Sequence, residues 1–230
     1  MFHGKALRRS LTLITALAFA IACAVSVFRH ESEVPRRNKL VSHIKGNLLV
    51  FEDLLEGGLP KNVGSHSWRS ALAKQGLGFF NINLDRPWGE TEPATPPSLF
   101  CVDGNEAAVF MIRENRNPES EKLRLSDAAP SLAVLVGFEN SGVHWMEVSD
   151  VSLDALRLGK LSIRTPEKTT DLAPRELLLG FVDGSVWRLN ADVPLRWVAE
   201  VCDPLKADAS RRERLIPFRQ PTWEEYWLGR

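Results

Sequence analysis

This sequence has no excess of charge of either sign. Its 230 residues include 29 Lys and Arg against 29 Asp and Glu, so the net charge is zero. Binding to nucleic acid requires a basic surface that neutralises phosphates, and this chain has no general basic field. We therefore expect no nucleic-acid partner.

Cysteine is also scarce, because the chain has only three. That number is too small for a disulfide-stabilised scaffold. Cys23 lies in an apolar run, which leaves Cys101 and Cys202 as a possible disulfide in an oxidising compartment. Two separate buried thiols explain the same residues equally well. Neither cysteine has a nearby Cys or His, so the spacing of zinc ligands is absent.

Motifs for catalysis are missing too. The chain has no Gly-x-Ser-x-Gly elbow and no phosphate-binding loop, and no acidic partner is indicated for Ser65-His66-Ser67. His144, Glu147 and Asp150 are candidate metal or acid–base groups, but they lack the spacing typical of zinc.

Calcium requires a run of alternating acidic ligands, which the loop aspartates Asp103, Asp183 and Asp192 do not form. Turn chemistry explains Asp103 and Asp183 better, since a glycine follows each of them. We predict no catalytic residue, no cofactor and no metal site.

One long hydrophobic run stands out against this background. Residues 11–28 carry no charge, and Lys5, Arg8 and Arg9 precede them. As a helix the run is about 27 Å long, close to the hydrocarbon thickness of a bilayer. It predicts a membrane-targeting element whose partner is the lipid bilayer.

Three fates fit this segment. A retained anchor fits its unbroken length, and we favour it. A cleaved signal peptide fits the repeated small residues at 18–24, and a lipid-modified Cys23 fits more loosely. Long downstream domains translocate largely regardless of charge. We therefore expect a single-pass protein of the cytoplasmic (inner) membrane with its C-terminal domain outside the cytoplasm.

Three further segments follow the anchor at residues 1–30. In residues 31–60 the apolar residues recur at spacings of three and four, as on one stripe of an amphipathic helix: Val41, Ile44, Leu48, Phe51 and Leu55. Gly57-Gly58 then predicts the end of this helix. Residues 61–202 are expected to form a globular α+β domain, and residues 203–230 a C-terminal tail.

Strand signals within the domain are short. Residues 99–102 and 107–112 flank a loop and predict a hairpin. The continuous apolar run at 132–138 predicts a central buried strand. Residues 177–189 predict a second hairpin, with Asp183-Gly184 in a type I′ turn.

Two short helices are predicted from the residues at their ends. Ser152 can cap one helix that Gly159 ends, and Pro194 can start another. Taken together, these patterns predict an α+β fold. In this fold an N-terminal transmembrane helix leads into the amphipathic helix, which packs on an antiparallel sheet.

Several fragments of the chain, taken in order, match a known family. They include Arg8-Arg9-Ser10-Leu11-Thr12-Leu13-Ile14-Thr15, Ser67-Trp68-Arg69, Asp85-Arg86-Pro87-Trp88, Glu139-Asn140-Ser141-Gly142-Val143-His144-Trp145-Met146-Glu147 and Gly180-Phe181-Val182-Asp183-Gly184-Ser185-Val186-Trp187. Their order resembles the pilin-like bacterial family of domain of unknown function 1559, common in planctomycetes, over about residues 5–202. The resemblance implies a pseudopilin-like fold with the structural signature residues Trp145, Glu147, Asp183, Gly184 and Trp187.

The chain departs from this family at its processing site and at its signature. Ser10 stands where prepilins have the processing glycine, and Thr15 where they have a glutamate that assists assembly. The signature histidine, which nine residues separate from Asp-Gly, is replaced by Ala173. The resemblance therefore implies a divergent member that keeps the globular domain.

These features favour a non-enzymatic, membrane-anchored envelope protein that acts through protein interaction, with envelope proteins or further copies of itself as partners. An alternative is a secreted or lipid-linked module that binds a small ligand or a surface glycan. Retention of residues 1–28 favours the first interpretation, and their clean removal the second. A third, an envelope hydrolase, requires His66 or His144 beside a nucleophile in a cleft.

We predict that prepilin peptidase does not cut between Ser10 and Leu11, because Ser10 and Thr15 replace two residues that define its substrates. Intact-mass measurement of the purified protein checks this. A mature chain that begins at a methylated Leu11 would contradict the prediction.

Overall fold

The structure is a computed structural model. It describes residues 36, 38–52, 59–76, 82–90, 97, 99–102, 104–113, 124–222 and 225. The chain divides into two compact units, Met1–Asn38 and Lys39–Arg230, and the second holds nearly all of the described residues. The apolar run at 11–28 lies outside the described residues. Within them, no helix combines the length and the apolar character needed to cross a bilayer.

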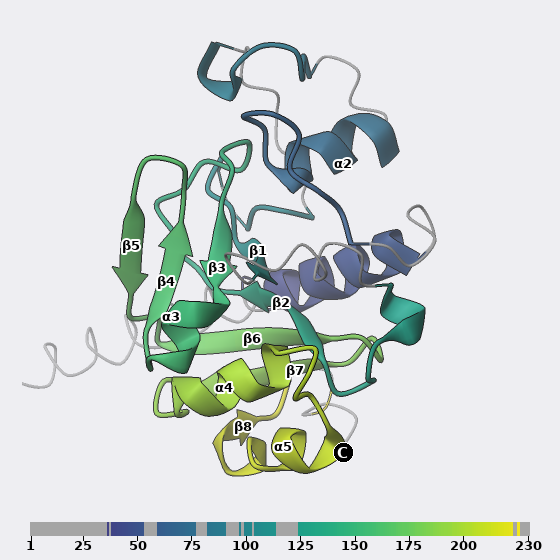
Figure 1. Ribbon diagram of the computed structural model, residues 1–230, viewed down its shortest axis with the longest axis vertical. Helices are drawn as coiled ribbons and strands as arrows, with labels where there is room; N and C mark the ends of the chain where they lie inside the picture. Colours follow the sequence, from purple (N-terminus) through teal and green to yellow (C-terminus); the bar gives the residue numbers. More distant parts are fainter. Residues whose placement is uncertain are drawn as a thin grey trace, which may run out of the picture. The chain divides into compact units, whose positions relative to one another are not determined.

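The second unit is built on one sheet of eight strands (Figure 1). They are β1 Val109–Arg113, β2 Ala133–Gly137, β3 Asp150–Ser152, β4 Leu161–Arg164, β5 Thr169–Leu172, β6 Glu176–Phe181, β7 Val186–Asn190 and β8 Arg219–Gln220. Their order is β5-β4-β3-β1-β2-β6-β7-β8, and every pair is antiparallel except β1 with β3. The predicted α+β class is confirmed.

Helices lie before, between and after the strands. Residues 39–52 are helical, as the apolar stripe predicts, although Leu55 and the Gly57-Gly58 stop lie outside the described residues. The labelled helices are α2 Trp68–Gly76, α3 Leu153–Arg157, α4 Leu195–Cys202 and α5 Ala209–Glu213, with short 3-10 turns η1 Trp88–Glu90, η3 Leu125–Asp127 and η4 Ile216–Phe218. Ser152 caps α3 by accepting a hydrogen bond from the Ala155 N–H, as predicted.

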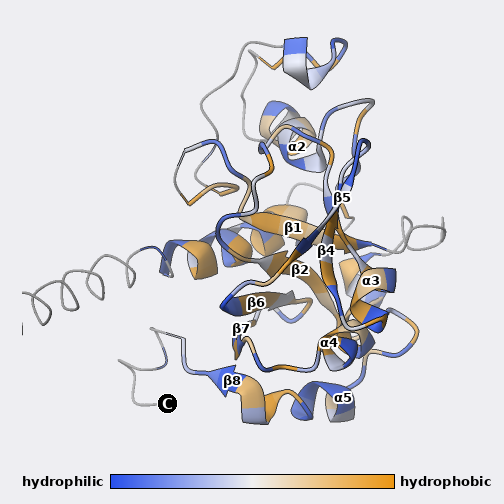
Figure 2. Cartoon of the chain, turned by 90° about the vertical axis from the view of Figure 1, so that its left-hand side faces the viewer, coloured by the Kyte–Doolittle hydropathy of each residue, from blue (hydrophilic) through white to orange (hydrophobic). Residues whose placement is uncertain are grey.

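The sheet is covered on both faces around β2 and β6. Figures 1 and 2 show helix 39–52 on one face of these strands and α4 on the other, with α3 beside α4 and β4. Every residue of β2 is buried, which confirms the central strand predicted from its apolar run. A strand covered on both faces reads as a continuous hydrophobic run rather than an alternating one.

Two glycines let helix 39–52 approach the sheet closely. A Cβ atom added to Gly137 of β2 would lie 2.7 Å from Ile44 Cδ1 and 3.1 Å from Leu40 Cδ1. One added to Gly180 of β6 would overlap Ile44 Cγ2 and lie 3.4 Å from Leu48 Cδ1. The buried stripe of the helix, Leu40, Ile44 and Leu48, therefore packs directly on the backbone of the two strands.

Two sequence predictions are wrong in detail. Residues 99–102 form a turn rather than a strand, although the Ala108 N–H does donate to the Phe100 carbonyl. In the hairpin of β6 and β7, only Gly184 has a positive φ, of 78°. The Gly184 N–H donates to Phe181 O, and the Phe181 N–H to Ser185 O. This is a three-residue loop with glycine in the left-handed position, not a type I′ turn.

We predict that Gly180→Ala destabilises the protein by about 1–3 kcal/mol, because the added methyl group forces Ile44 out of its packing position. Denaturant unfolding measures the change. The matched control is Gly89→Ala, since a Cβ there meets nothing within 4 Å and φ is not positive. Equal unfolding midpoints for both variants would show that the helix does not depend on this close approach.

Candidate functional site

The five signature residues fall into two clusters, each centred on an arginine. Trp145 and Glu147 lie in the segment that precedes β3 and contact Arg69 of α2 through their carbonyls. Asp183, Gly184 and Trp187 lie in the hairpin of β6 and β7, whose turn contacts Arg212 of α5. We call these groups the Arg69 cluster and the Arg212 cluster.

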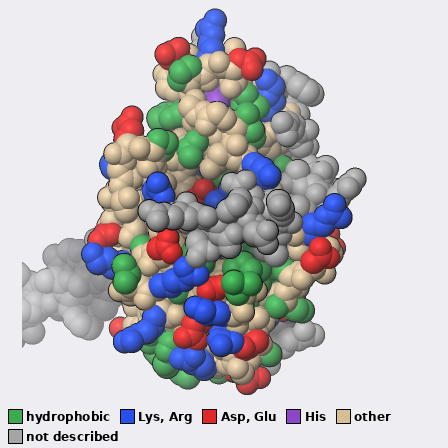
Figure 3. Space-filling model, in the orientation of Figure 1, with side chains coloured by type: hydrophobic (Ala, Val, Ile, Leu, Met, Phe, Trp, Pro, Cys, Tyr) green, Lys and Arg blue, Asp and Glu red, His purple; other side chains and the backbone are tan. Residues whose placement is uncertain are grey.

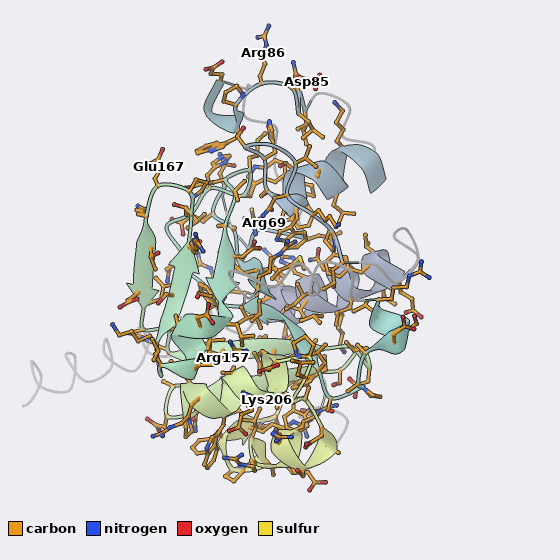
Figure 4. All side chains as sticks on the ribbon, in the orientation of Figure 1. Arg69, Asp85, Arg86, Arg157, Glu167 and Lys206 are labelled. Atoms are coloured by element: carbon orange, nitrogen blue, oxygen red, sulfur yellow. The ribbon has the colours of Figure 1, made fainter. Side chains whose placement is uncertain are left out.

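The guanidinium of Arg69 is fully buried and hydrogen-bonded to the surrounding backbone (Figure 4). Nε donates to the carbonyl of Trp145 at 2.9 Å, and Nη1 donates to that of Val109 at 3.2 Å. Nη2 donates to the carbonyl of Glu147 at 3.1 Å and to Ser149 Oγ at 2.6 Å. One side chain thus joins α2, β1 and the segment before β3.

Aromatic rings enclose the same group. Arg69 Cζ lies 5.3 Å from the ring centroid of Trp68 and 5.1 Å from that of Phe110. Burial lowers the pKa of Arg69 to about 10, against the opposing effect of Asp150, so the side chain stays charged at neutral pH. A buried cation of this kind is tolerated when its donors are paired.

Asp150 acts as the main counter-ion of Arg69, because its charge opposes the lowering of the Arg69 pKa. Arg113 Nε lies 3.4 Å from Asp150 Oδ2, and Asn62 Nδ2 donates to the same oxygen at 3.2 Å. Burial raises the pKa of Asp150, while Arg113, Arg69 and the hydrogen bond from Asn62 oppose the rise. Asn62 also accepts from the Trp68 N–H at 2.7 Å, so this network fixes the start of α2.

The two histidines that a hydrolase would need are engaged elsewhere. His66 is fully buried, and its Nε2 lies 2.7 Å from the carbonyl of Arg86. His144 stacks on Trp88 with a centroid distance of 5.1 Å, and its Nδ1 accepts from the Met146 N–H at 3.3 Å. Within the described part of the chain, both rings contact backbone groups or an aromatic ring, and no serine or cysteine is hydrogen-bonded to them.

Cys101 and Cys202 are both free and buried. The possible disulfide is therefore not formed, and the alternative of two separate thiols describes the structure. Cys202 is the last residue of α4, whereas Cys101 interacts electrostatically with Arg69, so the two thiols belong to different parts of the core. Burial raises the pKa of Cys101 to about 12 and also raises that of Cys202, which keeps both thiols protonated and unreactive.

In the Arg212 cluster a guanidinium lies over two neighbouring aromatic rings. Arg212 Cζ is 4.1 Å from the ring centroid of Phe181 and 4.5 Å from that of Trp187. Its Nη1 pairs with Asp183 Oδ2 at 2.5 Å, and its Nη2 donates to Ser185 Oγ. Burial alone would raise the pKa of Asp183, but the bonds from Arg212 and Ser185 bring it below its ordinary value. Trp187 is only partly buried, and Arg212 covers part of it.

More of the C-terminal segment packs by the same chemistry, on this hairpin and on α4. β8 pairs with β7, and Arg219 of β8 lies 4.8 Å from the Trp187 ring centroid. Arg214 lies 4.6 Å from the Trp197 centroid and pairs with Glu200. Figure 3 shows basic and acidic side chains intermingled on the surface of this region, which gives it no field of one sign.

The remaining candidates do not assemble into a metal site. Asp103 lies outside the described residues. Asp192 donates its backbone N–H to Asn190 Oδ1 in an ordinary turn. Across the described part of the chain, no three His, Cys, Asp or Glu side chains are close enough to hold a metal ion.

Sequence reasoning did not select Arg69 or Arg212 as organising residues. The signal for Arg69 is its position, directly after Trp68 and before the small and apolar residues 70–73. Arg212 stands in the charged stretch 211–214, where nothing distinguishes it from its neighbours.

Comparisons with known proteins add no relative to this picture. No protein-family model, no curated protein and no solved structure matches the chain.

We predict that Arg69→Met lowers the free energy of unfolding by more than about 3 kcal/mol, because the carbonyls of Val109, Trp145 and Glu147 lose a buried donor. The control is Arg164→Met, at an exposed position of β4. Thermal unfolding of the two variants compares them. A midpoint for Arg69→Met equal to that of the control would contradict the role assigned to the guanidinium.

Proposed function

We propose that this protein is a non-enzymatic, single-pass envelope protein, anchored in the cytoplasmic membrane by residues 11–28, and that its α+β unit acts through protein interaction. Its partners on this proposal are envelope proteins or further copies of the chain. The resemblance to the pilin-like family and its implied pseudopilin-like fold belong to the same proposal.

The observation that carries the proposal is the packing of helix 39–52. This helix follows the apolar run in the sequence and lays its apolar stripe across β2 and β6, at Gly137 and Gly180. A leading helix seated on an antiparallel sheet is the arrangement that the family resemblance implies. The eight-stranded sheet and its parallel β1–β3 pair are additions to that arrangement.

The chemistry of the described side chains supports interaction over catalysis. Arg69 donates to three carbonyls, His66 contacts a carbonyl, and His144 stacks on an indole ring. A hydrolytic site needs a nucleophile within hydrogen-bond reach of its base. The histidine rings instead hold the fold together.

The alternative function, a secreted or lipid-linked module that binds a small ligand or a surface glycan, shares the same α+β unit. The two differ in what happens to residues 1–28. Retention of these residues supports the anchored protein, and their removal supports the secreted module.

We predict that the protein stays in the membrane when isolated membranes are washed with alkaline carbonate, because residues 11–28 carry no charge over a length that spans a bilayer. Immunoblotting of pellet and wash measures the distribution. Replacing Leu17 and Ile21 by Asp provides the comparison, since charges at the centre of the run oppose insertion. Release of the unaltered chain into the wash would contradict the anchored function.

A further inference from the structure

The outer strand β5 leaves one edge of the sheet open. It comes first in the sheet order, and among the strands that the structure describes it pairs only with β4. Figure 1 shows it at the margin of the unit. Its residues, Thr169-Thr170-Asp171-Leu172, include no proline or glycine, and its register with β4 has no bulge. An open edge is a template for a further strand, and native sheets block such edges with proline, a bulge, a charge or a covering segment.

The hydrogen bonds between β4 and β5 fix which backbone groups face outward. The Thr165 N–H donates to the Lys168 carbonyl beside the turn, so these two residues form a hydrogen-bonded pair. Hydrogen-bonded and non-hydrogen-bonded pairs alternate along an antiparallel ladder. In the register of the two strands, Thr169 and Asp171 therefore fall in non-hydrogen-bonded pairs, and their N–H and C=O groups point away from β4.

The side chain of Asp171 agrees with this pattern. Side chains approach most closely in non-hydrogen-bonded pairs, and Ser162 Oγ, directly across in β4, donates to Asp171 Oδ1 at 2.5 Å. Lys160 Nζ lies 3.4 Å from Asp171 Oδ2. Because the charge of this carboxylate is partly balanced within the sheet, the one acidic residue of β5 does not close the edge.

We propose that β5 pairs with β5 of a second copy of this chain, antiparallel and about a two-fold axis, so that two sheets join edge to edge. A two-fold interface uses the same surface of both copies, and the outward groups of Thr169 and Asp171 include both donors and acceptors. The pairing rests on the proposed function, which names further copies as partners and anchors them in one membrane, where their effective concentration is raised.

The charges of the strand select one register for this pair. Backbone hydrogen bonds form only where outward-facing residues stand opposite one another, which leaves three registers centred within β5. One of them places Asp171 opposite Asp171, and another places Asp171 opposite Glu167. Like charges directly opposite destabilise a strand pair. The third register places Thr169 opposite Asp171 and Thr170 opposite Thr170, and no carboxylates are opposed.

In this register the side chains are complementary. The hydroxyl of Thr169 lies opposite the carboxylate of Asp171, and the symmetry repeats this pair. Each of the two pairs exchanges two backbone hydrogen bonds. Lys168 lies opposite Leu172, where its aliphatic stem covers an apolar side chain that is only partly buried in a single copy. Thr170 meets its own counterpart at the two-fold axis.

Disulfide trapping in isolated membranes tests the pairing and its register. In the proposed register the Cα atoms of residue 170 in the two copies are about 4.5 Å apart, within reach of a disulfide. Those of residue 169 are about 7–8 Å apart, beyond that reach. After mild oxidation we expect Thr170→Cys to give a dimer severalfold more abundant than Thr169→Cys gives. The background is the full chain with Cys23→Ser, because Cys101 and Cys202 are buried.

Charges at position 169 provide a matched pair of variants. Within one copy this residue lies opposite Arg164, so Thr169→Asp suits the sheet and Thr169→Lys does not. Across the two copies it lies opposite Asp171, so the order is reversed. In chains that also carry Thr170→Cys, we expect Thr169→Asp to lower the dimer yield severalfold and Thr169→Lys to keep or raise it. A change in folding alone would act in the opposite direction.

Three results would overturn the pairing. They are a dimer yield for Thr170→Cys no greater than that for Thr169→Cys, equal yields with Asp and Lys at position 169, and a cross-link to another protein in place of a second copy. The carbonate wash tests the anchor separately. A chain that is washed off and still forms the residue 170 disulfide contradicts the anchored function and not the pairing, whereas a retained chain without that disulfide contradicts the pairing alone.

Discussion

The rest of the unit depends on the hydrogen bonds that the buried guanidinium of Arg69 donates. The segment that precedes β3 makes few regular backbone hydrogen bonds, so its carbonyls at Trp145 and Glu147 need donors from elsewhere. Arg69 donates to both, beside Ser67 Oγ at Trp145 and Ser149 Oγ at Glu147, and it also donates to Val109 of β1. The cost of burying its charge is offset because four acceptors and two aromatic rings surround it. β3 thereby lies beside β1, and among the strands that the structure describes this is the only parallel pair.

A second constraint acts on the other side of β1. Helix 39–52 can lie on β2 and β6 only because Gly137 and Gly180 have no side chains to hold it away. The Arg212 cluster then closes the far end, where α5 and β8 pack on the hairpin of β6 and β7. The sheet is thus organised by one buried arginine, two glycines and one stacked arginine.

Contacts of the same kind make two histidines part of the fold. His66 contacts the Arg86 carbonyl and His144 stacks on Trp88, so both rings join the central framework to residues 82–90.

The sequence by itself determined the features that follow from local pattern. The apolar stripe of 41–51 gave the helix, the run at 132–138 the buried strand β2, and Ser152 the start of α3, because periodicity and capping act within a few residues. Tertiary structure alone decided the partners of Arg69 and Arg212, which lie 76 and 29 residues away along the chain at Trp145 and Asp183. It also decided that the two thiols stay apart and that β3 joins β1, since no local signal records which distant carbonyl, ring or strand will come to lie beside a side chain.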